Sequence, residues 1–164
     1  MELGRFLRHI VMHPARATSA FPPAVMDAIQ AEIRAQEATH SGEILFVVEA
    51  ELSTWQLWHD LRPRERAREV FALRGAWNTE DNNGILIYVL LAERVVEIVA
   101  DRGIAKRVAE SQWREVCAGM ERAFADGRFE EGAVAGVRGV AALLEREYPG
   151  ARHANELPDR PALI

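Results

Sequence analysis

The chain has 164 residues, 49% of them hydrophobic, and a formal net charge of −5. This length and composition suit one domain with a well-buried core. The negative charge argues against a general nucleic-acid binder, because neutralising phosphates requires clustered lysine and arginine. The single cysteine, Cys117, excludes an intrachain disulfide and a metal site made of several cysteines.

Targeting signals are not evident in the sequence. Arginine or glutamate interrupts every apolar run before it reaches the length of a membrane span. The N-terminus lacks an apolar stretch followed by a small-residue cleavage site, so no secretory signal is expected. We therefore expect a cytoplasmic protein, soluble or peripheral to a membrane, which a lone cysteine fits.

Residues 1–20 are expected to form a basic amphipathic segment that precedes the domain. Its apolar side chains recur at helical spacing with basic residues between them: Leu3, Phe6, Leu7, Ile10 and Val11. Such a helix can lie on an anionic membrane surface, or it can pack through its apolar stripe on this domain or a partner. We favour packing, because such stripes most often face a core.

The domain itself is expected over residues 21–150. Phe21-Pro22-Pro23 opens a helix, because proline suits a first helical position, and Gly42 ends it. The unbroken apolar run from Ile44 to Val48 then predicts a strand that helices cover on both faces.

Two tryptophans follow this strand. Trp55 and Trp58 share one face of a short helical stretch, which we expect to cover the sheet; an exposed partner-binding anchor is the alternative. A further helix begins at Arg62-Pro63 and leads to a second strand. The two strands are therefore expected to run parallel, joined by a crossover helix.

A β-hairpin is predicted next, because only Glu93 and Arg94 separate the apolar runs 85–92 and 95–100. The fold class is then a three-layer α/β/α sandwich around a short mixed sheet that contains this hairpin. On the last helix three glycines share a face and predict close approach to another backbone: Gly132, Gly136 and Gly139. The tail, residues 151–164, lacks periodicity and is expected to be disordered.

The hairpin predicts a site. Antiparallel neighbours place the start of one strand beside the end of the other, so residues 79–84 should lie next to residues 101–103. The carboxylates there can ligate a hard cation, calcium or magnesium: Glu80, Asp81 and Asp101. The other candidate binding residues are Thr79, Asn82, Asn83, Gly84, Arg102 and Gly103. A cation could polarise a phosphate ester that Arg102 holds.

Two alternatives to this site stay open. An Asp-Asn-Asn-Gly run also suits a loop that enters a strand, since asparagine and aspartate bond their own backbone and glycine takes unusual angles. Ligands of open α/β sheets otherwise favour the carboxyl ends of parallel strands. That edge would present Glu49, Glu51, Glu93 and Arg94.

The hairpin also carries a resemblance. The run NTEDNNGILIYVLLAERVVEIVADRGI resembles the core of the TPM domain family, and HSGEILFVVEA and RERAREVFALRGAW are similar to its first strand and second helix. The resemblance extends from about Phe21 to Tyr148 and implies an α/β/α sandwich. It also implies several roles, because members are described as acid phosphatases, divalent-cation binders or accessory factors for membrane complexes. Asp101 stands where the family often has a glycine.

No nucleophile, base and orienting group form a recognisable catalytic constellation. Cys117 lies on an apolar helical stripe with no histidine near it in sequence, which favours a core residue. We therefore predict a non-catalytic TPM interaction module that acts with a protein or membrane partner, with calcium or magnesium as its candidate cofactors. The alternative is a weak, cation-dependent acid phosphatase.

Overall fold

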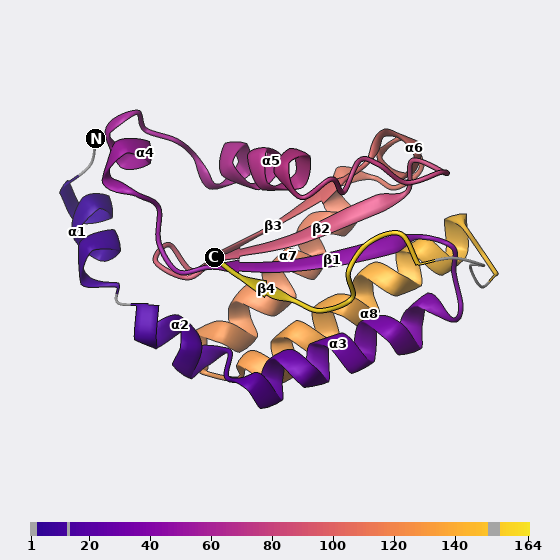
Figure 1. Cartoon of the computed structure of the whole chain (residues 1–164), viewed down its shortest axis with the longest axis horizontal. Helices are drawn as coiled ribbons and strands as arrows, with labels where there is room; N and C mark the ends of the chain where they lie inside the picture. Colours follow the sequence, from indigo (N-terminus) through magenta and orange to yellow (C-terminus); the bar gives the residue numbers. More distant parts are fainter. Residues whose placement is uncertain (1–2, 13, 151–154) are drawn as a thin grey trace.

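A four-stranded sheet runs through the middle of the protein, with the strand order β3-β2-β1-β4. The computed structural model describes residues 3–12, 14–150 and 155–164. Helices cover both faces of the sheet (Figure 1). The predicted three-layer α/β/α sandwich around a mixed sheet is therefore confirmed.

The two central strands are parallel. β1 (Glu43–Glu49) pairs with β2 (Gly84–Leu90) along its whole length, and every residue of both strands is buried. Unbroken apolar runs predict such strands, because helices pack on both of their faces. β3 (Val95–Ala100) pairs antiparallel with β2, and the short β4 (Ala162–Leu163) pairs parallel with the end of β1.

Three long helices pack on one face of the sheet: α3 (Pro23–Glu37), α7 (Glu110–Ala125) and α8 (Phe129–Glu147). The other face carries α5 (Pro63–Leu73), preceded by the short α4 (Thr54–Trp58). At the carboxyl end of the parallel strands lie α1 (Leu3–Val11) and α2 (Pro14–Ala20), and α6 (Arg102–Ala105) lies at the opposite end (Figure 1). The two ends of the sheet are therefore built from different segments.

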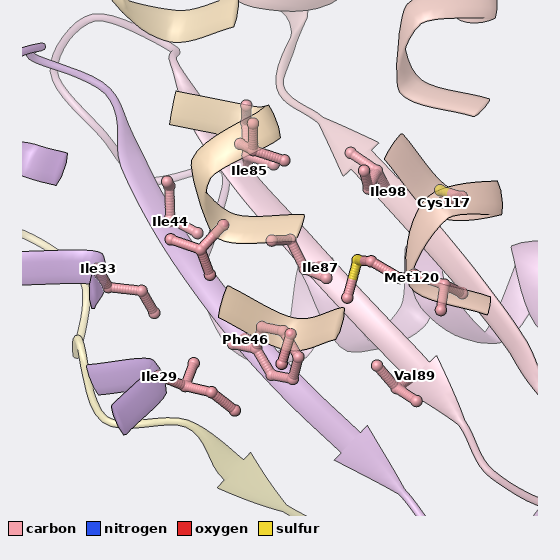
Figure 2. Packing of buried hydrophobic residues seen from close by; sticks show 14 of the residues in the cluster. Ile29, Ile33, Ile44, Phe46, Ile85, Ile87, Val89, Ile98, Cys117 and Met120 are labelled. Atoms are coloured by element: carbon pink, nitrogen blue, oxygen red, sulfur yellow. The ribbon is translucent and has the colours of Figure 1, made fainter. Parts of the chain in front are cut away.

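The alternation of side chains divides the core into two clusters. Ile44, Phe46 and Val48 face α3, α7 and α8 in the larger cluster (Figure 2), whereas Leu45 and Val47 face α5 in the smaller one. Successive residues of a strand point to opposite faces, so one apolar run serves both layers.

The glycine face of α8 allows α7 to approach closely. A Cβ atom on Gly136 would lie 2.2 Å from Met120 Sδ, and one on Gly132 would lie 2.8 Å from Ala123 Cβ. The predicted close approach is confirmed, and its partner is α7.

The hairpin link has four residues, 91–94, rather than the two predicted. The N–H groups of Leu91 and Ala92 donate to the carbonyls of Glu49 at 3.0 Å and Ala50 at 3.1 Å. These two residues therefore continue along the chain that follows β1 instead of pairing with β3.

The prediction of a disordered tail is wrong for residues 155–164, whereas 151–154 lie outside the described residues. Leu157 is buried in the smaller cluster, and its N–H donates to Glu43 Oε2 at 2.8 Å. Asp159 accepts from Arg34 Nε at 2.7 Å. An extended segment held by strand pairing and single polar contacts needs no periodicity, which is why the sequence pattern missed it.

The expectation that the two tryptophans cover the sheet is wrong. Trp55 and Trp58 are 69% and 72% exposed, and the buried residue of α4 is Leu57. The apolar stripe of α1 packs on the domain only through Phe6, which contacts the smaller cluster, whereas Leu3, Leu7, Ile10 and Val11 are exposed. Packing of these four residues on a partner stays a prediction. No helix in the described part of the chain is both long and apolar enough to cross a membrane.

Candidate functional site

The structure brings the two predicted segments together at the amino end of the parallel strands. The N–H of Asp101 donates to the Gly84 carbonyl at 2.9 Å, and the N–H of Gly103 donates to the Asn82 carbonyl at 3.0 Å. We call residues 79–84 and 101–107, with the chain around Tyr148, the amino-end site.

Hydrogen bonds fix the loop that enters β2. Thr79 Oγ1 accepts from the Asn83 N–H at 3.1 Å, and Asn83 Nδ2 donates to the Ser41 carbonyl at 3.0 Å. Asn82 has a φ of 52°, a left-handed conformation that asparagine tolerates. Gly84 is required because a Cβ atom there would lie 2.0 Å from the Ala76 carbonyl oxygen. Thr79 and Asn83 therefore act in loop structure.

The three predicted carboxylate ligands do not gather. Glu80 and Asp81 are exposed in the turn, whereas Asp101 is 5% exposed and caps α6, its Oδ1 accepting from the Arg102 N–H at 2.7 Å. Among the described residues, no group of three histidine, cysteine, aspartate or glutamate side chains could hold a metal ion. A cation at this end would need amide and backbone oxygens in addition to carboxylates.

Several buried polar atoms at this end lack hydrogen-bond partners within the described structure. They are Asp101 Oδ2, Asn83 Oδ1 and both ring nitrogens of His40. Burial lowers the pKa of the His40 imidazole to about 4, so the ring is neutral at physiological pH. Buried polar groups are otherwise almost always paired, so the two oxygens are acceptors at this end that the described residues leave unused.

An open cleft of about 660 Å³ lies at the amino-end site. Its lining consists of Asp81, Asn82, Arg102, Gly103, Lys106, Arg107 and Tyr148. Three of these side chains are cationic and one is a carboxylate. Lys106 and Arg107 were not predicted as site residues. They follow α6, a single helical turn, and the sequence pattern does not show which way so short a helix runs. No role was predicted for His40 either.

The cationic side chains differ in how they are held. Arg107 is positioned by the protein, with Cζ 4.6 Å from the Tyr148 ring centroid and Nη1 donating to the Glu147 carbonyl at 3.0 Å. Within the described residues, the side chains of Arg102 and Lys106 form no ion pair, although they line the same cleft. This surface therefore favours an anionic ligand.

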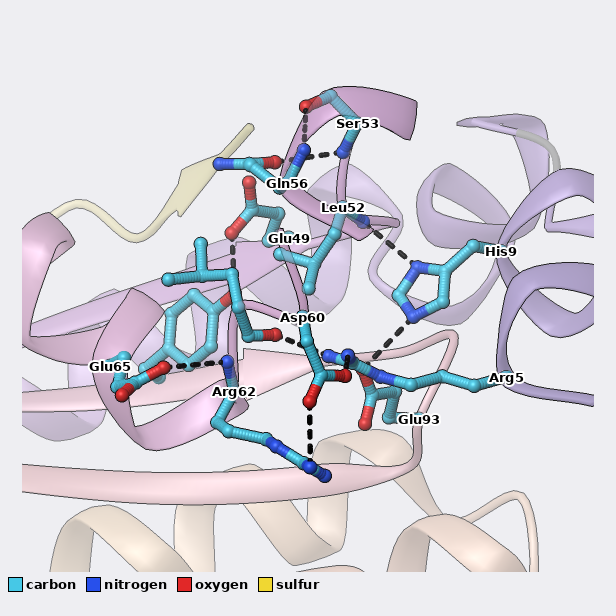
Figure 3. Close-up of polar contacts among 12 residues, drawn as sticks. Arg5, His9, Glu49, Leu52, Ser53, Gln56, Asp60, Arg62, Glu65 and Glu93 are labelled. Atoms are coloured by element: carbon cyan, nitrogen blue, oxygen red, sulfur yellow. Dashed lines mark hydrogen bonds and ion pairs between the residues drawn. The ribbon is translucent and has the colours of Figure 1, made fainter. Parts of the chain in front are cut away.

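At the alternative site, the carboxyl ends of the strands, two of the candidate carboxylates are paired with the protein's own side chains (Figure 3). Glu49 accepts from Arg66 Nη2 at 2.9 Å and from the Tyr88 hydroxyl. Glu93 accepts from Arg5 and His9. Burial and the Glu49 carboxylate raise the pKa of the Tyr88 phenol. The phenol therefore stays protonated and donates its hydrogen bond to Glu49.

Cys117 behaves as a core residue. It lies in the larger cluster, and burial raises the pKa of its thiol to about 12. Because the thiolate is the nucleophilic form, this cysteine is unreactive at neutral pH.

A family model described as the TPM domain matches residues 16–143. The NMR structure of BA42 from the psychrophilic bacterium Bizionia argentinensis is similar to this chain at 28% identity and a TM-score of 0.71, covering 86% of this chain and 93% of that one. The solution NMR structure of the N-terminal domain of a protein from P. gingivalis is similar at 20% identity and a TM-score of 0.63, covering 81% of this chain and 82% of that one. No curated protein matches. With the family model spanning most of its length, this chain belongs to the TPM domain family.

Proposed function

We propose that this TPM domain is a non-catalytic accessory module whose amino-end cleft binds a phosphate-bearing ligand. The observation that carries the proposal is the lining of the cleft, where Arg102, Lys106 and Arg107 meet a single carboxylate, Asp81. Charge-assisted hydrogen bonds from arginine and lysine to phosphate are among the strongest in proteins.

We propose that the module is non-catalytic because of the side chains that line this cleft. Its titratable side chains are the three cations, Asp81 and Tyr148. Phosphate hydrolysis needs an activated nucleophile or a metal-bound water near the ester. Asp81 is exposed in the turn, and among the described residues neither a histidine nor a second carboxylate lines the cleft beside it. The cleft is suited to holding a phosphate group rather than to cleaving its ester.

A divalent cation is a second candidate ligand, supported by the unpartnered oxygens of Asn83 and Asp101. Calcium takes six to eight oxygen ligands, including amide and backbone carbonyl oxygens. These two side chains would supply part of such a shell. A bound cation there would add positive charge beside the cleft and strengthen the attraction for phosphate.

The test is a titration of isotope-labelled protein with inorganic phosphate and then phenyl phosphate, followed by backbone amide shifts. Saturable shifts confined to residues 79–84, 101–107 and 148 are expected. Arg102→Gln and Lys106→Gln should each weaken binding about tenfold, because each removes a charged donor. Arg114→Gln, an exposed arginine on α7, is the matched control and should bind normally.

Three outcomes count against the proposal. Absence of saturable shifts up to millimolar phosphate would remove the ligand site. Cation-dependent hydrolysis of phenyl phosphate by purified protein, lost in Asp81→Asn, would replace binding with phosphatase activity. Titration with calcium and then magnesium tests the second candidate, which fails if Asp101→Asn leaves cation-induced shifts unchanged.

A further inference from the structure

Helix α1 is attached to the domain by its polar side. Arg5 is 5% exposed and His9 is 1% exposed. Arg5 Nη2 lies 2.8 Å from Glu93 Oε1, and its Nη1 lies 3.1 Å from Asp60 Oδ1. We call Arg5, His9, Asp60 and Glu93 the clasp (Figure 3).

The clasp also orients the histidine ring. The N–H of Leu52 donates to His9 Nδ1 at 2.9 Å, so the ring proton of a neutral His9 sits on Nε2. Nε2 lies 3.0 Å from Glu93 Oε1 and donates to it. Both ring nitrogens are used, which fixes the rotation of α1 about its axis.

This rotation turns the apolar side of α1 outward. The outward residues are 51–70% exposed: Leu3 (70%), Leu7 (51%), Ile10 (59%) and Val11 (61%). Helices on soluble domains ordinarily bury this side and expose the polar one. Here buried ion pairs hold the polar side, so the exposed stripe is not the result of a helix that has failed to pack.

A cleft of about 650 Å³ lies beside the outer face of α1, between α1, the start of α2 and the β2–β3 link. Its lining includes Arg8, Arg16 and Arg94, all exposed and without an ion-pair partner among the described residues. The one carboxylate in the lining, Glu93, is already neutralised by the clasp. The outer face is therefore flanked by positive charge on a protein whose net charge is −5.

Helix α4 lies next to α1 at this end of the sheet (Figure 1) and presents Trp55 and Trp58, which are 69% and 72% exposed. Tryptophan is enriched where proteins meet the interface of a bilayer, since its ring is both apolar and polar. Apolar side chains, tryptophans and unpaired arginines thus occur together at one end of the molecule.

We propose that this face docks the domain on an anionic membrane surface, with Leu3, Leu7, Ile10 and Val11 entering the headgroup region and the three arginines meeting lipid phosphates. Amphipathic helices bind membranes through buried apolar area plus attraction to anionic lipids. A nine-residue helix is marginal in water, but the clasp holds α1 helical before contact. The domain therefore presents a preformed surface.

Co-sedimentation of the full chain with vesicles tests the proposal. Binding is expected to phosphatidylcholine vesicles that contain phosphatidylglycerol, with weaker binding to pure phosphatidylcholine and weaker binding as salt rises. The double variant Leu7→Gln/Ile10→Gln should lose affinity about tenfold or more, because two exposed apolar side chains no longer enter the interface. Arg8→Gln should lose about fivefold, the effect of one basic residue near an anionic surface.

The control is Leu73→Gln/Arg74→Gln, which makes the same two kinds of change at an exposed leucine and arginine at the end of α5, and it should bind normally. Arg102→Gln/Lys106→Gln locates the contact: a loss of vesicle binding as large as that of the Leu7/Ile10 variant would overturn the proposal, because the phosphate cleft at the other end would then hold the lipid. Equal binding to both vesicle types, or binding that survives the Leu7/Ile10 change, would overturn the proposal. So would a concentration-dependent dimer that this change abolishes in the absence of vesicle binding, because a second copy would then cover the face.

Discussion

The two ends of the sheet both bury carboxylates, but they treat them differently. At the carboxyl end, Glu49 is paired with Arg66 and Tyr88, and Glu93 is paired with Arg5 and His9. At the amino end, one oxygen of Asp101 has no partner within the described residues. Paired buried charges hold a structure together. Glu49 and Glu93 therefore stabilise the fold at the carboxyl end, whereas Asp101 is a buried carboxylate whose second oxygen the described residues leave unpaired.

The largest effect is expected from Glu49→Gln. The side chain keeps its size but loses its charge, which leaves Arg66, whose side chain is 16% exposed, without its buried counterion. Removing one partner of a buried pair is strongly destabilising, and we expect the free energy of unfolding to fall by about 3 kcal/mol. Urea denaturation measures it.

Tyr88→Phe provides the matched control for Glu49→Gln. Glu49 then keeps its two-donor contact with Arg66, so a loss of about 1 kcal/mol is expected for one hydrogen bond. Equal losses in the two variants would contradict the view that the ion pair dominates at this end.

Lowering the pH should weaken the amino end through His40. Burial lowers the pKa of its imidazole from 6.5 to about 4. Between these pH values the unfolded chain binds a proton that the folded protein does not, so stability falls as the pH drops from about 6.5 to 4 and then levels off. The full loss is roughly 3 kcal/mol, from 1.36 kcal/mol per pKa unit.

Denaturation at a series of pH values measures this loss, and His40→Leu is the comparison. The variant should be less sensitive to pH over this range, because leucine takes up no proton. A variant that loses stability with falling pH as steeply as the original chain would show that other groups cause the dependence.

A smaller effect is expected from Glu93→Gln in the clasp. Arg5 and His9 lose their shared acceptor charge, but Asp60 still contacts Arg5, so a local loss of about 2 kcal/mol is expected. Hydrogen exchange should show faster exchange in residues 3–11 with little change in β1 and β2. Unchanged exchange in α1 would mean that its apolar side chains, not the clasp, hold it.

The sequence predicted those parts of the protein that a local pattern encodes. The unbroken apolar run of β1, the two apolar runs of the hairpin and the glycine spacing on α8 were each located correctly, although the hairpin link is longer than predicted. For α1 the apolar pattern did not show which side faces the domain, because Arg5 and His9 find partners at residues 52, 60 and 93 that no local rule connects to them. These long-range contacts turn most of the apolar stripe outward, and only Phe6 of the stripe packs on the domain.

For the candidate site, the sequence predicted which segments lie together but not where their side chains point. Strand pairing placed residues 79–84 beside residues 101–103, which needs only the register of a hairpin. The direction of each side chain could not be predicted from the sequence, because it depends on single hydrogen bonds. Asp101 turns inward to cap α6, while Glu80 and Asp81 remain in water. The order of residues 155–164 was not predicted for the same reason. Polar contacts such as that of Arg34 with Asp159 produce no periodic pattern in the sequence.

The smallest effect on stability is expected from Asp101→Asn, the amino-end counterpart of Glu49→Gln. Asparagine caps a helix about as well as aspartate, so the bond to the Arg102 N–H is retained and a change within about 0.5 kcal/mol is expected. The same exchange of a carboxylate for an amide should thus cost about 3 kcal/mol at one end and almost nothing at the other. Urea denaturation of the two variants side by side measures the contrast. A loss at Asp101 as large as that at Glu49 would mean that its charge is needed for folding, and the amino end would then be structural as well.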